Sequence, residues 1–426
     1  MAEKKKYLGI ASDMIFSIAA VVVLNAVIQL FIYPSFNKRL GAALYGEAIT
    51  VMSMVAVVGV GFGIALNYSR MVMRTKKRAV KGDYNIFLLL AWLLCIPAAV
   101  LTEYLFAAQK SALNTVCIAI LMISTVARYY SDVEFKLNIN YKGYFVYYVF
   151  IAVGYCLGMP IFFKTGNWLV PLIIGEIAAV AFTAVRGKLY RKPFFARSEH
   201  FTDNAKSVGI LSLSYLADTL MQNADRLLLS GMTHDGAMVT TFYNAALIGK
   251  VIALLTTSLN SVLIGYLSKF EGKFTKKFFT IIALALLILG IVAVAACTVV
   301  SHIFIRLMYG EEIYEMCKPY FLIANAGQVL YFISGTIMVV VLRFAKEKYQ
   351  MHINILYAVL YLAVVPALTS VYQIWGLAWG ILAVNLIKYI VVYIIGIAQL
   401  SKRNKAEPAS ASGEKDFDVF IKDNSK

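Results

Sequence analysis

Long apolar segments recur along almost the whole chain, and they limit its possible folds more than any other feature. A membrane-crossing helix needs about 20 mostly apolar residues, because each residue rises about 1.5 Å and the hydrocarbon core is about 30 Å thick. Twelve stretches meet or approach that length. They cover residues 11–33, 44–66, 86–107, 112–130, 143–163, 167–185, 207–230, 239–266, 278–304, 319–342, 353–372 and 375–398. This pattern predicts an all-α membrane protein with 12 transmembrane helices.

Composition supports the same fold class. Hydrophobic residues make up 61% of the 426 positions, against about 45–50% in soluble globular proteins. One soluble fold cannot bury so much apolar surface, so lipid must cover part of it. The first apolar run follows three lysines, as in a signal peptide, but it is too long for one and no small-residue cleavage site ends it. We therefore expect it to be retained as the first span.

Lys and Arg are distributed unequally between alternate loops, and this distribution predicts the orientation. With the N-terminus inside, 31 of the 40 Lys and Arg fall on the cytoplasmic side, six fall outside and three fall within spans. Cytoplasmic loops of membrane proteins carry such an excess. We therefore expect both termini in the cytoplasm. The net charge of +17 is then explained without a nucleic-acid partner.

A short sequence pattern recurs about half a chain apart. Tyr45–Ala48 opens the second predicted span and Tyr243–Ala246 opens the eighth, 198 residues later. Similar segments, residues 65–70 and 264–269, close these two spans. Coincidence is the alternative, because membrane sequences use few residue types. The repeat predicts two like-oriented six-helix bundles, with the domain limits at residues 1–200 and 201–400, and a disordered cytoplasmic tail at residues 401–426.

The sequence shows no catalytic or metal-binding motif. Its five cysteines and four histidines are scattered, so neither a disulfide framework nor a zinc site is expected. It contains no Walker-type phosphate loop, no G-x-S-x-G and no paired His/Glu metal motif. The Gly-x-Gly-x-Gly run at residues 59–63 follows no strand, so it predicts close helix packing or a flexible segment. We expect no enzyme activity, no cofactor and no metal, and any uphill transport must use an ion gradient or a downstream sink.

Lys250 is the clearest charged residue at membrane depth. It lies 15 residues after Asp235 and 19 before Lys269, which corresponds to about 22 and 28 Å along a helix. A charge near the bilayer centre costs a few kcal/mol and is retained where it faces protein or a water-filled cavity. Lys250 is therefore a candidate substrate-binding cation. The alternatives are a structural partner for a buried acid and an error in the limits of the span.

Polar residues in the seventh predicted span share one helical face. Ser214, Asp218, Gln222 and Asp225 follow one another at spacings of four, four and three residues, so they lie on the same side of a helix. Asp218 is deep enough for ion coupling or substrate contact, and the alternative is a buried ion-pair network that holds this helix in place. Asp225 and Arg226 are adjacent and point apart, so they are expected to pair with other helices.

Other polar residues of the first two spans are further candidates. Asn25 and Gln29 follow a stripe on the first span and are expected to face inward as interhelical hydrogen-bond donors. Glu47 opens the second span and joins Asp218 and Asp225 as a third candidate for ion coupling. An interfacial position would also explain Glu47.

Three more charged residues lie within predicted spans or next to their ends. Lys388 lies in the twelfth span, where it either lines a cavity or extends its ammonium group to the surface. Arg128 and Asp132 are at the inner end of the fourth span. We expect both at the membrane interface.

A set of short motifs, each weak alone, occurs in a defined order. The first half has Tyr-Pro, Leu-Gly and Tyr-Gly after the first span, and the second half has Asn-x-Asp-Arg, a Gly and an aromatic that opens the eighth span. In this chain the motifs are Tyr33-Pro34, Leu40-Gly41, Tyr45-Gly46, Asn223-Ala224-Asp225-Arg226, Gly231 and Tyr243. From residue 10 to residue 400 the chain resembles the polysaccharide branch of the multidrug/oligosaccharidyl-lipid/polysaccharide exporter superfamily, the flippases for O-antigen and capsular repeat units.

The resemblance implies a V-shaped pair of bundles around a cationic cavity in the bacterial inner membrane. It implies an undecaprenyl-pyrophosphate-linked oligosaccharide as the substrate, moved from the inner to the outer leaflet. Lys250 would bind the pyrophosphate, aided by Arg226 or Lys388, while side chains such as Asn25 and Gln29 would contact sugar. A polysaccharide polymerase, glycosyltransferases and membrane lipid are the partners expected for such an exporter. The family's cavity would be lined with cations from both halves of the chain. This chain differs, because the spans of its first half carry few basic residues.

Three other functions compete with the flippase hypothesis. A drug/cation antiporter of the same superfamily would depend on acids such as Asp218 rather than on Lys250. An exporter of a related lipid or teichoic chain would have a similar sequence. A membrane enzyme such as a glycan polymerase would normally have a long outer loop, and the longest outer loop here, residues 305–318, is too short.

Overall fold

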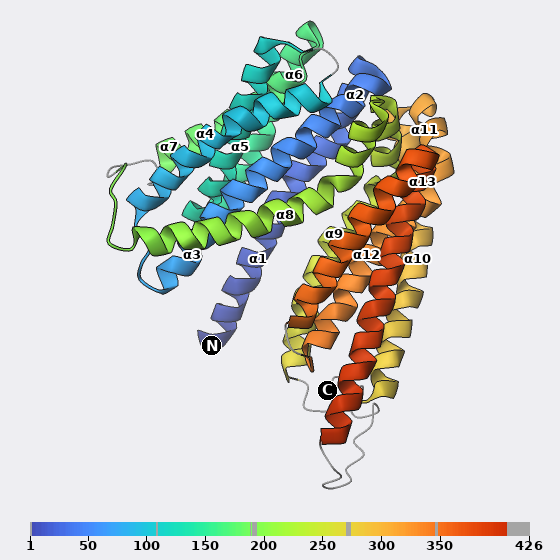
Figure 1. Cartoon of the computed structure of the whole chain (residues 1–426). Helices are drawn as coiled ribbons and strands as arrows, with labels where there is room; N and C mark the ends of the chain where they lie inside the picture. The colour runs from blue at the N-terminus through green and yellow to red at the C-terminus, as the bar shows by residue number, and fades with distance from the viewer. Residues whose placement is uncertain are drawn as a thin grey trace. The chain divides into compact units, whose positions relative to one another are not determined.

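The structure is a computed structural model that describes residues 2–107, 110–187, 189, 194–269, 274–345 and 348–406. Within them, side-chain surroundings are described for residues 12–402 except 252–259, 261–262, 264–269 and 348. The described residues form helices and short connections, and no strand occurs among them (Figure 1). The all-α prediction is confirmed for this part of the chain.

The helices follow the predicted apolar segments closely. The first part of the chain contains α1 (Ala2–Val27), η1 (Ile28–Ile32), α2 (Tyr33–Val58), η2 (Gly59–Ile64), α3 (Ala65–Thr75), α4 (Lys81–Phe106), α5 (Ala112–Leu137), α6 (Tyr141–Thr165), α7 (Leu169–Arg186) and α8 (Phe201–Thr233). The rest contains α9 (Gly236–Lys269), α10 (Lys276–Tyr309), α11 (Glu311–Cys317), η3 (Lys318–Tyr320), α12 (Phe321–Leu342) and α13 (Lys348–Ala406). Each predicted segment falls on helix. The remainder of the predicted tail, residues 407–426, lies outside the described residues.

Eight helical runs in the described part of the chain are long and apolar enough to cross a membrane. Two of them, Ser12–Thr75 and Tyr349–Lys402, contain 64 and 54 residues, far more than the about 20 that one crossing needs. Non-helical backbone interrupts the first run at Gly41 (φ 79°) and the second at Gln373 (φ 51°). Both breaks lie between predicted spans. The number of twelve crossings and their orientation stay predictions.

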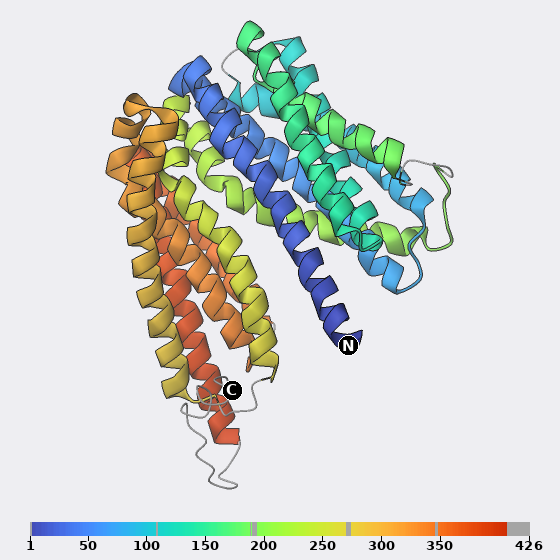
Figure 2. The ribbon, with the colours of Figure 1, turned by 180° about the vertical axis from the view of Figure 1, so that it is seen from behind.

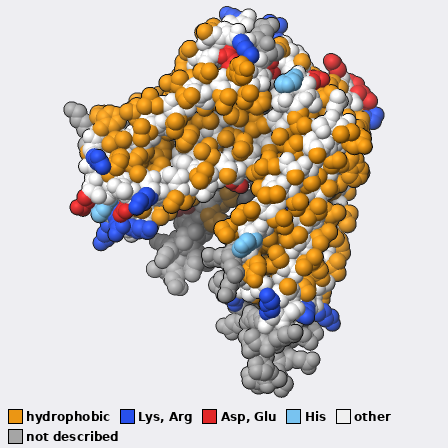
Figure 3. Space-filling view, viewed as in Figure 1, with side chains coloured by type: hydrophobic (Ala, Val, Ile, Leu, Met, Phe, Trp, Pro, Cys, Tyr) orange, Lys and Arg blue, Asp and Glu red, His pale blue; other side chains and the backbone are white. Residues whose placement is uncertain are grey.

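The outer surface of the helices is apolar, as lipid contact requires. Large hydrophobic side chains are exposed on several helices, including Leu93 on α4 (55%), Leu157 on α6 (67%) and Ile288 on α10 (62%). Figure 3 shows apolar side chains over the flanks of the helices and Lys and Arg side chains toward the helix ends. Backbone polar groups in lipid must be satisfied internally, and helices meet that requirement.

The chain divides into two compact units, Met1–Thr241 and Phe242–Lys426. In the first unit α8 packs against α2, η2 and α3, and α1 lies along α6 (Figure 2). The contacts therefore group α8 with the first unit. The predicted bundle limits at residues 1–200 and 201–400 describe a sequence repeat, and they stay a prediction.

Small residues bring α6 and α7 close together in the first unit. Gly154 and Gly158 are spaced as in G-x-x-x-G, a pattern that lets two membrane helices approach closely. A Cβ added at Gly154 would lie 2.9 Å from Cα of Gly175 on α7. The connection between these helices turns at Gly166, which has a left-handed backbone (φ 74°). The predicted spans 143–163 and 167–185 are therefore two helices joined by a short connection.

The glycine run at residues 59–63 is buried within the π-helical segment η2. A Cβ at Gly63 would lie 2.6 Å from Cβ of Tyr129 and 2.7 Å from the carbonyl oxygen of Val126, both on α5. The run therefore serves close helix packing, one of the two roles predicted for it.

Candidate functional site

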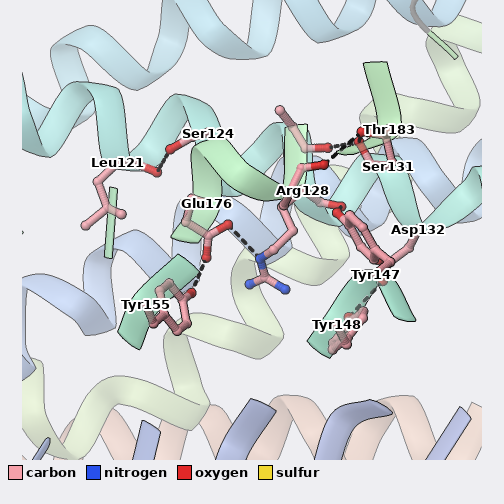
Figure 4. A network of polar contacts seen from close by, with 12 residues as sticks. Leu121, Ser124, Arg128, Ser131, Asp132, Tyr147, Tyr148, Tyr155, Glu176 and Thr183 are labelled. Carbon is pink, nitrogen blue, oxygen red and sulfur yellow. Dashed lines mark hydrogen bonds and ion pairs between the residues drawn. The ribbon is translucent and has the colours of Figure 1, made fainter. Parts of the chain in front are cut away.

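A buried cation and a buried carboxylate meet where α5, α6 and α7 pack together (Figure 4). Arg128 on α5 places Nε 2.7 Å from Oε2 of Glu176 on α7, and their side chains are only 8% and 4% exposed. Tyr155 on α6 donates its hydroxyl to the other carboxylate oxygen, Oε1, at 2.6 Å. The Arg128 guanidinium also lies 3.9 Å from the ring centroid of Tyr129. We call Arg128, Glu176 and Tyr155 the buried triad.

A second buried carboxylate lies one helical turn further along α5. Asp132 Oδ2 accepts hydrogen bonds from the hydroxyls of Tyr144 and Tyr148, each at 3.2 Å. These tyrosines are four residues apart on α6, so their side chains share one helical face. Lys136 Nζ lies 3.7 Å from the same oxygen. The other oxygen, Oδ1, is buried and has no hydrogen-bond partner among the described residues.

The two clusters contain two cations and two carboxylates. The Tyr147 hydroxyl donates to the backbone carbonyl of Arg128 at 3.3 Å, which joins α6 to α5. Thr183 on α7 donates to Ser131 on α5, also at 3.3 Å. A buried charge is tolerated when it is paired and hydrogen-bonded. The network therefore ties three helices together at one depth.

Two predictions concern residues of this network. Arg128 and Asp132 were expected at the membrane interface; the structure buries both against protein, with 6% and 4% exposed, and their depth in a membrane stays a prediction. Their helix, α5, extends to Leu137, seven residues beyond the predicted end of the span. The spans of the first half were expected to carry few basic residues, and Arg128 is a buried one. Glu176 was missed, although it is the only acidic residue in the segment 167–185.

The predicted polar face of the seventh span lies on α8. Asp218 is exposed, and its carboxylate accepts a hydrogen bond from Gln222 at 2.8 Å. Asp225 is buried, and its Oδ1 lies 3.5 Å from Arg226 Nε. The expectation that adjacent Asp225 and Arg226 would avoid each other is wrong, because the long arginine side chain reaches back along the helix.

The predicted residues on α1 and α2 occupy varied positions. Asn25 is exposed and donates a hydrogen bond from its side-chain amide to the carbonyl of Val21 at 2.8 Å. This bond lies within one helix, whereas an interhelical hydrogen bond was expected. Gln29 is half-buried in the π-helical turn η1, and Glu47 is half-buried on α2.

The two predicted lysines of the second unit lie on different helices. Lys250 is half-buried on α9, next to Gly249, whose backbone N–H donates to Asn325 Oδ1 of α12 at 2.7 Å. Lys388 on α13 is also half-buried, and its Nζ lies 4.3 Å from the ring centroid of Tyr331 and 4.4 Å from that of Tyr357. An ammonium within about 6 Å of an aromatic face is attracted by the ring. The structure thus places Lys388 between two tyrosines.

Metal-binding groups are not apparent in the described part of the chain, where no set of three His, Cys, Asp or Glu side chains is arranged to hold an ion.

The sequence and the fold can both be compared with known proteins. Neither a protein-family model nor a curated protein matches the sequence.

Several solved structures share the fold. An inward-facing multidrug resistance MATE family transporter of the MOP superfamily has a TM-score of 0.63 and 14% identity, covering 90% of this chain and 95% of its own. The lipid II flippase MurJ, in an inward closed conformation, has a TM-score of 0.64 and 18% identity, covering 92% of this chain and 87% of its own. A MOP superfamily transporter from Pyrococcus furiosus, described as having a binding pocket of reverse polarity, has a TM-score of 0.57 and 14% identity, covering 94% and 96%.

Identities of this size establish a shared fold and no more. Two of these proteins are described as transporters of the MOP superfamily, which the sequence motifs resemble, and the third is described as a lipid II flippase. The chain therefore has the all-α membrane fold of the MOP superfamily transporters.

Proposed function

We propose that this protein is a flippase that moves an undecaprenyl-pyrophosphate-linked oligosaccharide repeat unit from the inner to the outer leaflet, by alternating access with ion coupling, for surface polysaccharide synthesis. In this proposal the chain crosses a bacterial inner membrane twelve times, as two six-helix bundles with both termini inside. The ordered motifs support the polysaccharide branch. The fold shared with a lipid II flippase is consistent with a lipid substrate.

The observation that carries the proposal is the position of Lys388. Its ammonium lies within 4.4 Å of two tyrosine ring centroids, inside a helical run that is long and apolar enough to cross a membrane. A cation at that depth favours an anionic ligand and opposes a cationic one. A pyrophosphate supplies the anion, and the hydroxyls of Tyr331 and Tyr357 suit a sugar. A cationic drug would be repelled.

The sequence predicts Lys250 as the main pyrophosphate contact, aided by Arg226 or Lys388, and the ring contacts of Lys388 lead us to exchange the roles of the two lysines. Lys250 and Arg226 would then assist Lys388 in binding the pyrophosphate, and Asn25 and Gln29 would contact sugar. Ion coupling would use Asp218, Asp225 and Glu47, and each can be substituted separately.

The test is a flipping assay in proteoliposomes that contain undecaprenyl-pyrophosphate-linked oligosaccharide and a sugar-cleaving enzyme outside. Lys388→Gln should lower the initial flipping rate at least tenfold, because a ligand phosphate loses a charged partner worth about 1.5–3 kcal/mol. Lys388→Arg should retain most of the rate, since it keeps the charge. The matched control is Lys318→Gln, which removes an exposed lysine, with a side chain 49% exposed, at the end of a helix. Equal rates for Lys388→Gln and the control would reject Lys388 as a substrate contact.

A drug/cation antiporter is the second candidate, favoured by the fold shared with multidrug transporters. It predicts proton-driven efflux of ethidium that Asp218→Asn abolishes and Lys388→Gln leaves unchanged. Ethidium efflux without lipid flipping would replace the flippase proposal with this one.

A further inference from the structure

A cavity of about 320 Å³ lies at the ends of α5, α6 and α7, outside every residue that the proposed function uses. Its walls combine charged, amide and apolar side chains from the three helices. They are Glu134, Phe135, Asn138, Asn140, Lys142, Gly143, Val146, Phe182, Arg186 and Gly187. Since a water occupies about 30 Å³ in the liquid, the cavity has room for roughly ten waters, or for a phosphate with its ester groups.

Two cations line this cavity from separate helices. Lys142 is in the first turn of α6 and Arg186 ends α7, and both side chains are exposed. Neither belongs to an ion pair among the described residues; their charged groups instead lie 5.8 Å from the ring centroids of Phe16 and Phe182, respectively. Glu134 is the acidic residue of the lining. The lining therefore carries a net positive charge, which suits a monoanion.

An apolar stripe leads away from the same cavity along α6. It starts at a wall residue, Val146, and repeats at helical spacing on one face. Its members are between 43% and 67% exposed: Val146, Phe150, Val153, Leu157 and Ile161. A ligand with an anionic head and a long apolar tail matches this combination, whereas a free phosphate would not use the stripe.

We propose that this cavity binds the headgroup of an anionic phospholipid. The phosphate lies between Lys142 and Arg186, and an acyl chain follows the stripe on α6. Basic pockets between membrane helices on the cytoplasmic side are a known form of lipid headgroup site, and these helix ends lie on the side that the Lys and Arg distribution predicts to be cytoplasmic. The inference goes beyond the proposed flippase activity and does not depend on it.

The test measures lipid bound to the purified full-length protein by native mass spectrometry in a mild detergent. Phosphatidylglycerol, which carries one negative charge, is compared with zwitterionic phosphatidylcholine. The double variant Lys142→Gln/Arg186→Gln should weaken the tightest phosphatidylglycerol site about 25-fold, at about fivefold per cation lost near a membrane surface. The control Arg74→Gln/Lys76→Gln removes two exposed cations, two residues apart, at the end of α3, and should change affinity less than twofold.

Each result decides the proposal. Selective loss in the cavity variant, with phosphatidylcholine binding unaffected, supports it. Equal weakening by the control variant shows a general charge effect and overturns it, as does unchanged binding in the cavity variant. Displacement of phosphatidylglycerol by a lower concentration of undecaprenyl pyrophosphate would assign the cavity to a polyprenyl ligand instead. All four substituted residues are exposed, so the variants should fold, and circular dichroism checks that they do.

Discussion

Replacing Glu176 with Leu should destabilise the first unit by about 3–5 kcal/mol, the usual cost of removing one partner of a buried ion pair. The magnitude follows from the geometry of the buried triad. With charge centres about 4 Å apart and an effective dielectric of about 20, the attraction alone is about 4 kcal/mol. The substitution also removes the acceptor of the Tyr155 hydroxyl, at 2.6 Å. Arg128, with a side chain 8% exposed, would be left buried without its carboxylate.

The structure offers a matched control on the second unit. Arg306 and Glu311 form a pair with the same Nε–Oε2 distance, 2.7 Å, but with side chains 60% and 55% exposed. Because water screens an exposed pair, Glu311→Leu should cost much less stability than Glu176→Leu. The two substitutions therefore change the same residue type at the same distance and differ in burial.

The assay is reversible unfolding of the purified protein in mixed detergent micelles with increasing dodecyl sulfate. A third variant, Arg128→Met/Glu176→Leu, removes both charges together and should recover most of the lost stability, because apolar residues of similar volume replace buried pairs well. Two results would refute the reasoning. One is a cost for Glu176→Leu as small as for Glu311→Leu. The other is a double variant as unstable as the sum of its single variants, which would show no coupling between the two side chains.

Three further perturbations test other parts of the structure. Gly154→Leu should lower stability in the same assay by about 1–3 kcal/mol or more, because its side chain would meet Gly175; an unchanged midpoint would contradict the close packing. Asp83 accepts hydrogen bonds from the backbone and hydroxyl of Ser198, at 2.9 and 2.6 Å. Asp83→Ala should therefore speed proteolysis near Ser198 about a hundredfold, because it removes roughly 3 kcal/mol of local stability. An unchanged cleavage rate would contradict a stabilising role for these hydrogen bonds. Lys250→Ala should abolish surface polysaccharide at unchanged protein level, and normal polymer output would remove Lys250 from the mechanism.

Helix positions were predictable because lipid imposes a length and a composition on each span. The breaks in helical backbone at Gly41 and Gln373 fall between predicted spans for the same reason. The predicted span ends at residue 130 because Arg128 and Asp132 were treated as signs of the membrane surface, whereas α5 continues to Leu137. Each of the two side chains has a buried partner, Glu176 for Arg128 and Tyr148 for Asp132. Sequence hydropathy contains no information on such pairing.

Depth could nevertheless have suggested the buried triad. Glu176 lies 10 residues before Arg186 at the end of α7, and Arg128 lies nine before Leu137 at the end of α5, or about 15 and 14 Å from helix ends on the same predicted side. Opposite charges at equal depth in neighbouring helices are candidates for pairing. The sequence does not say which faces of these helices meet. Those faces depend on the close approach of α6 and α7, which their glycines allow, and this role of the glycines is seen only in the folded structure.

The same comparison separates structural cations from candidate substrate contacts. Arg128 has a carboxylate oxygen at 2.7 Å and a side chain 8% exposed, so a ligand phosphate would have to displace an existing partner. Lys388 is half-buried, and its ammonium lies 4.3 and 4.4 Å from the ring centroids of Tyr331 and Tyr357, each of which attracts a cation by roughly 0.5–2 kcal/mol. In the proposed function Lys388 has to bind an anion and release it again. Transport needs that reversibility, and a fully paired cation such as Arg128 cannot supply it without disrupting the packing of three helices.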